Sequence, residues 1–171
     1  MNILQASLLT IFPALMIIAG LTDVTSFTIP NRLSVLLAAA FLPTALIVGR
    51  PLGEIGVDLG VGAAGLIAGM AMFAAGWIGG GDAKLFAVAG LWLGWPALPE
   101  FLAVTALAGG GLAVLLLNAR SSFVRIHLTG APDWLARLTT PGADVPYGVA
   151  IAIGALAAFP LSGLMQGFRV L

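Results

Sequence analysis

The stretch that decides the fold runs from residue 55 to residue 84 and reads IGVDLGVGAAGLIAGMAMFAAGWIGGGDAK. Its first 24 residues carry a single charge, Asp58, and three glycines and an aspartate follow them. Because a helix rises about 1.5 Å per residue, about 20 apolar residues can cross the roughly 30 Å hydrocarbon core of a bilayer. The stretch therefore predicts a membrane-spanning helix that ends in a glycine-rich turn.

The rest of the chain has the same character. Of its 171 residues 60% are hydrophobic and 8% are charged, whereas soluble domains carry about 25% charged residues. Seven acids and seven bases give a net charge of zero, which excludes a basic nucleic-acid-binding protein. There is no cysteine, so disulfides, thiolate metal sites and a cysteine nucleophile are excluded. We expect a single domain, residues 1–171, that lies in the lipid bilayer and uses neither metal nor cofactor.

Five further apolar segments complete the predicted fold, an all-α, polytopic integral membrane bundle of about six transmembrane helices. The spans are expected at residues 3–21, 33–49, 55–78, 85–98, 101–117 and 147–168. The fourth has only 14 residues, about 21 Å of helix, so we expect it to begin below the lipid surface. A turn and a short interfacial helix are expected around Trp134. Glycine pairs four residues apart, such as Gly65 and Gly69, favour close helix packing within the bundle.

Basic residues are distributed unequally between the two ends of the predicted bundle. The connections after the first, third and fifth spans hold five of the seven, and the opposite end holds Arg50 and Arg169. By the positive-inside rule, the end with five bases is predicted to be cytoplasmic. Those five residues are Arg32, Lys84, Arg120, Arg125 and Arg137. At the opposite end, Glu54, Asp58 and Glu100 are interpreted as loop or interface charges.

Two aspartates, Asp23 and Asp82, are separated by two predicted crossings, which places both at the same membrane face in either orientation. Asp82 follows glycines 79–81, which allow another chain to approach the backbone closely. An ionisable group at membrane depth is costly and is a candidate functional residue. Two neighbouring carboxylates that share one proton suit aspartic peptidase chemistry. The ionised carboxylate takes a proton from water, and the protonated carboxyl donates to the peptide carbonyl oxygen under attack.

Three motifs resemble those of the type IV prepilin peptidases. GGGDAK at residues 79–84 matches the Gly-x-Gly-Asp-x-Lys motif of that family. Asp23, followed by IPN at 29–31, matches its first aspartate motif, and VPYG at 145–148 looks like its Pro-Tyr-Gly element. The resemblance implies a membrane aspartic endopeptidase that cuts the short leader from prepilin and pseudopilin precursors, with Asp23 and Asp82 as the catalytic pair.

The resemblance also implies further site residues, a branch and a location. The residues expected to bind substrate or shape the site are Gly79, Gly80, Gly81, Lys84, Pro30, Asn31, Pro146, Tyr147 and Gly148. The chain lacks the cysteine region of longer members that also methylate the new N-terminus, so methyltransferase activity is not implied. It is similar to the short peptidases of tight-adherence (Flp-type) pilus systems. The implied location is the bacterial inner membrane, multi-pass, with the site facing the cytoplasm and the pilus assembly machinery nearby. Residues 24–28 lack the basic side chains that relatives often have.

Several of these residues also fit simpler roles. Asp82 suits a helix cap. Lys84 fits either contact with a negative group or a positive-inside anchor. Asn31 fits a plain turn, and Tyr147 fits the interfacial aromatic belt. Asp144 lies close to the Pro-Tyr-Gly element and is a candidate for a minor role at the site.

Two other functions fit parts of the pattern. A presenilin-like intramembrane peptidase also uses Gly-x-Gly-Asp, but Thr22 precedes Asp23 where those enzymes have tyrosine, and the Pro-Ala-Leu sequences at 13–15 and 96–98 are misplaced. A small proton-coupled transporter or membrane scaffold would also use membrane-depth acids, although neither aspartate stands at mid-span. The single histidine, His127, has no partner at metal-ligand spacing and is interpreted as a loop residue.

Overall fold

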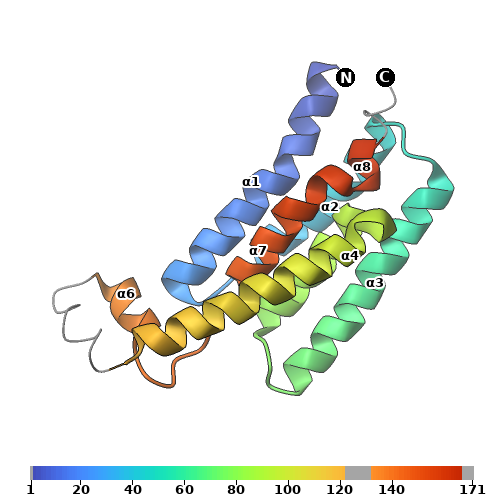
Figure 1. The fold of residues 1–171 in the computed structure, drawn as a ribbon. Coiled ribbons are helices and arrows are strands. Elements are labelled where there is room, and N and C mark those ends of the chain that lie inside the picture. The colour runs from blue at the N-terminus through green and yellow to red at the C-terminus, as the bar shows by residue number, and fades with distance from the viewer. Residues whose placement is uncertain (1, 122–131, 167–171) are drawn as a thin grey trace.

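The computed structural model describes residues 2–121 and 132–166, and these form helices and turns with no strand (Figure 1). The elements are α1 (Ile3–Ser26), α2 (Asn31–Ile47), α3 (Leu52–Ala74), α4 (Gly80–Ala119), α6 (Asp133–Leu138), α7 (Tyr147–Ala158), the 3-10 turn η1 (Phe159–Leu161) and α8 (Gly163–Gln166). Four helical segments within the described residues are long and apolar enough to cross a membrane: α1, α3, α4 and Tyr147–Gln166. The predicted class, an all-α membrane helix bundle, is confirmed.

Helix α4 reverses its direction at Gly94. This residue has φ 65° and ψ −175°, a backbone conformation that is essentially restricted to glycine. The reversal divides α4 into a first arm, residues 80–93, and a second arm, residues 95–119, that runs back toward α6 (Figure 1). Both ends of α4 accordingly lie near Asp144, which shares a cavity with Asp82 and accepts a hydrogen bond at its carbonyl oxygen from Arg120. A straight helix of 40 residues would separate its ends by about 60 Å.

The two arms correspond to the predicted fourth and fifth spans, but the predicted boundary between residues 98 and 101 is wrong. The first arm has as many residues as the predicted span 85–98, but it begins five residues earlier, at Gly80, so Asp82 lies in its first turn. Pro96 falls in the first turn of the second arm, where a missing N–H costs little because that donor has no partner within the helix. The chain therefore reverses at the residue that tolerates positive φ, ahead of the prolines.

The first arm of α4 lies at the centre of the bundle. Trp92 stacks on Phe12 of α1, with ring centroids 5.3 Å apart, and its indole N–H donates to the carbonyl oxygen of Leu37 in α2, 2.8 Å away. On the other side, a Cβ built at Gly69 would lie 2.9 Å from the carbonyl oxygen of Ala83. Contact this close confirms that the small residues of α3 serve packing inside the bundle.

The short helix predicted around Trp134 is also confirmed as α6. Arg120, at the end of the second arm, holds the chain beside it, because its Nε donates to the carbonyl oxygen of Leu138, 3.0 Å away. Side chains on the outside of the bundle are apolar, including Ile67 of α3 and Leu107 of α4, and they suit contact with lipid. Arg125, His127 and Arg169 lie outside the described residues.

Candidate active site

Asp23 and Asp82 line one cavity of about 210 Å³ at the end of the bundle nearest α6. Asp23 lies near the end of α1 and Asp82 in the first turn of α4, and their side chains are 4% and 7% exposed. Asp144 and Tyr147 form part of the same wall. The fold thus brings together two acids that are 59 residues apart in the sequence. They lie at the same end of the bundle, as expected for residues separated by two membrane crossings.

The start of α7 holds the carboxylate of Asp23. The backbone N–H of Gly148 donates to Oδ2 of Asp23 over 2.8 Å. The first N–H groups of a helix have no partner within the helix and carry its positive dipole end, so they suit a carboxylate. A Cβ at Gly148 would lie only 2.7 Å from the same oxygen, so this approach requires glycine.

Asp82 is held by the glycine motif that precedes it. The N–H of Gly79 donates to Oδ2 of Asp82 over 3.0 Å, so the aspartate caps the first arm of α4 and lines the cavity as well. A Cβ at Gly81 would lie 3.1 Å from Cβ of Ile29, so this glycine lets the two aspartate motifs pack on each other.

The remaining motif residues surround the cavity at different distances. Gly79, Pro146 and Tyr147 line it directly, whereas Gly80 packs against Phe73. Pro30 precedes the first turn of α2 as its N-cap residue.

Lys84 and Asn31 pair with each other outside the wall of the acid cavity. Nζ of Lys84 donates to Oδ1 of Asn31 over 2.8 Å, which ties α4 to the start of α2. This contact places the lysine beside the site but not among the residues that line the cavity. Within residues 2–121 and 132–166, no three His, Cys, Asp or Glu side chains gather as a metal site would require.

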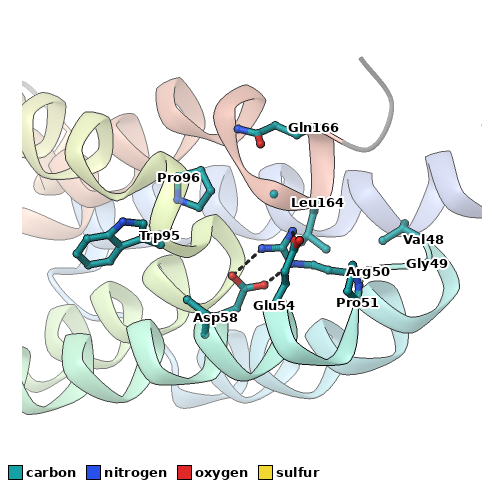
Figure 2. Close-up of a pocket in the computed structure, with 12 residues that line it drawn as sticks. Val48, Gly49, Arg50, Pro51, Glu54, Asp58, Trp95, Pro96, Leu164 and Gln166 are labelled. Carbon is teal, nitrogen blue, oxygen red and sulfur yellow. Dashed lines mark hydrogen bonds and ion pairs between the residues drawn. The ribbon is translucent and has the colours of Figure 1, made fainter. Parts of the chain in front are cut away.

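A second polar cluster lies at the opposite end of the bundle, and the sequence interpretation of Asp58 was wrong. Asp58 is fully buried, and the guanidinium of Arg50 binds its carboxylate through Nε and through Nη2, the latter over 2.9 Å (Figure 2). Glu54, exposed as expected, binds Nη1 of Arg50 over 2.8 Å. The spacing of four residues indicates only that Glu54 and Asp58 share a face of α3, because Arg50 precedes that helix and is not covered by the rule.

This cluster borders the reversal of α4. Arg50, Asp58, Trp95 and Pro96 line a cavity of about 470 Å³ (Figure 2). A Cβ at Gly94 would overlap Oδ1 of Asp58, so the buried ion pair packs directly on the backbone where the two arms meet.

Fold and site together define an all-α membrane protein with two buried aspartates at one end of its bundle. The chain belongs to the type IV leader peptidase family, whose model matches residues 10–114. The matched segment contains both aspartates and both arms of α4 as far as residue 114. Membership confirms the family resemblance and makes the protein a peptidase of the leader peptidase type. No curated protein and no solved structure matches the chain.

Proposed function

We propose that the protein is an aspartic endopeptidase that removes the short leader from type IV prepilins and pseudopilins, those of Flp-type pili in particular. One observation carries the proposal: Asp23 and Asp82, from two different helices, are both buried in the wall of one small cavity. Within residues 2–121 and 132–166, neither carboxylate forms an ion pair with a basic side chain. Burying two such acids is costly, and a cost of this kind is typical of a functional site.

The cavity supplies the groups that peptide hydrolysis needs. A water held between the carboxylates loses a proton to the ionised one, and its oxygen attacks the carbonyl carbon of the peptide. The protonated carboxyl donates to the carbonyl oxygen as charge develops there. When the C–N bond breaks, a proton passes to the leaving nitrogen, and the dyad again holds one proton. The Gly148 N–H keeps the carboxylate of Asp23 oriented throughout, and the Gly79 N–H does the same for that of Asp82.

We further propose a multi-pass protein of the bacterial inner membrane with the acid cavity at the cytoplasmic face. Lys84 and Arg120 flank the two ends of α4, both at the end of the bundle that holds the acids, and Arg137 lies in α6. Arg50 is at the far end and is neutralised by its acidic partners. An excess of bases at the end that holds the acids supports a cytoplasmic location.

The test is co-expression with a candidate pilin precursor and measurement of leader removal by mass spectrometry. Asp23→Asn and Asp82→Asn should each lower processing by at least about 100-fold, the contribution typical of a general acid or base. Asp133→Asn, an exposed aspartate of α6 outside the cavity wall, is the matched control and should process at the parent rate. If either dyad variant inserts in the membrane and still processes like the parent, the proposal is wrong.

A further inference from the structure

An apolar surface extends from the acid cavity along the bundle. Beside that cavity lies a second one of about 440 Å³, and the two share Ile78 and Tyr147 in their walls. The second cavity shares Phe86 and Leu102 with a third of about 510 Å³. Because each cavity has wall residues in common with the next, the second and third form one continuous surface, which we call the apolar groove.

Two helices form the long walls of the apolar groove. On α3 the lining residues include Val57, Ala64 and Ala68, spaced so that they share one helix face. On the second arm of α4 the lining runs from Trp95 to Ala113. Eighteen steps of about 1.5 Å give about 27 Å, close to the roughly 30 Å hydrocarbon core of a bilayer. The groove is therefore about as long as one membrane-spanning helix.

Polar residues lie on the other side of the acids. A cavity of about 330 Å³ contains Ser26, Arg137 and Thr140, and it shares Phe27 and Asp144 with the acid cavity. From one end to the other, the chain thus presents a polar cavity, the two carboxylates and then the apolar groove. A ligand that fills all three meets charged and hydroxyl side chains on one side of the acids and an almost entirely apolar surface on the other.

We infer that the apolar groove receives the single apolar helix of the substrate, while the polar cavity takes the segment on the other side of the cut bond. This inference rests on the proposed function and adds where the substrate lies. The small side chains of α3 let a helix approach its backbone closely, which is how helices associate in lipid. A lipid acyl chain would match the apolar walls, but it would give no reason for the groove to continue into a cavity with two acids.

The absence of native cysteine allows a direct test by disulfide formation. Ala64→Cys is introduced into the Asp82→Asn protein, which keeps the precursor uncut, and a pilin precursor carries one cysteine in the middle of its apolar helix. Ala63→Cys is the matched control, because Ala63 is the adjacent exposed residue of α3 and lies outside the groove wall. Since a disulfide requires Cα atoms within about 7 Å, mild oxidation should give at least about fivefold more cross-link at position 64.

A second pair of variants measures the same site through turnover. Ala64→Phe fills the groove and should lower kcat/KM for the intact precursor by at least about tenfold, mainly through KM, as expected when binding alone is weakened. Ala63→Phe adds the same bulk outside the groove and should leave processing at the parent level.

The outcomes separate this inference from the proposed function. Equal cross-linking at both positions, or none at position 64 while the parent chain processes the precursor, overturns the groove assignment and leaves the peptidase proposal intact. A lipid-filled groove would give that second result. Strong cross-linking at position 64 with no processing by the parent chain supports the groove and overturns the peptidase proposal.

Discussion

Removing the carboxylate of Asp58 tests how the end of the bundle opposite the acids is held together. The side chains of Asp58 and Arg50 are 2% and 6% exposed, and the guanidinium binds the carboxylate through two nitrogens. In Asp58→Ala the one ion-pair partner left to the buried guanidinium among the described residues is Glu54, whose side chain is 57% exposed. The variant therefore leaves a charge in the protein interior with a weak, solvent-screened partner.

The expected loss follows from that burial. Deleting one partner of a buried ion pair lowers the free energy of unfolding by about 3–5 kcal/mol, which reduces the ratio of folded to unfolded protein by at least about 100-fold. Glu54→Gln removes an exposed partner from the same guanidinium and should cost at most about 1 kcal/mol. The double variant Arg50→Met/Asp58→Leu should be more stable than Asp58→Ala, because it leaves no buried charge without its partner. The Glu54 carboxylate also loses Arg50, but it is exposed to solvent.

Unfolding can be followed in mixed micelles by titrating a denaturing detergent and recording tryptophan fluorescence. The protein has four tryptophans, and the buried Trp92 reports on the core around the first arm of α4. The reasoning is refuted if Asp58→Ala and Glu54→Gln unfold within about 1 kcal/mol of each other. It is also refuted if the double variant Arg50→Met/Asp58→Leu is less stable than Asp58→Ala.

Two further predictions concern glycines. Gly148→Ala should lower precursor processing by at least about tenfold, since its methyl group would lie 2.7 Å from Oδ2 of Asp23 and displace the carboxylate from a geometry that catalysis requires. Gly111→Ala is the control, because nothing lies within 4 Å of a Cβ at that position. If Gly148→Ala processes the precursor like the parent, the close approach of Gly148 to Asp23 is dispensable. Gly69→Ala should lower the free energy of unfolding by about 1–3 kcal/mol, because its Cβ would lie 2.9 Å from a carbonyl oxygen of α4. Gly56→Ala is its control, because nothing lies within 4 Å of a Cβ there. If Gly69→Ala and Gly56→Ala unfold at the same detergent concentration, the packing argument is wrong.

The common location of the two acids could be predicted from the sequence because it depends only on counting crossings. Asp23 and Asp82 remain at one end of the bundle whether the chain reverses at residue 94 or at residue 99. The place of the reversal could not be predicted in the same way. Pro99 and Glu100 resemble a connection, but Gly94 alone adopts the positive φ that a close reversal uses there.

Two contacts were out of reach of sequence patterns for different reasons. The Gly148 amide donates to Asp23 through the backbone, which every residue type except proline offers, so the residue type says nothing about a donor at that position. The burial of Asp58 depends on Arg50 folding back across a turn after Gly49, which has φ 80°. Hydropathy indicates only that a charge stands near a helix end, and tertiary contacts decide whether it faces water.

The hydrogen bond from Gly148 to Asp23 joins residues that are 125 positions apart, and this separation affects how the protein is made. A nascent chain that has emerged as far as the second arm of α4 already contains both aspartates. It still lacks the start of α7, which supplies the Gly148 amide that holds Asp23 and also forms the side of the cavity at Pro146 and Tyr147. The cavity is therefore completed only after α7 has been made and has packed against α1 and α4. Because α7 is translated after both aspartates, a nascent chain without α7 cannot have a complete acid cavity.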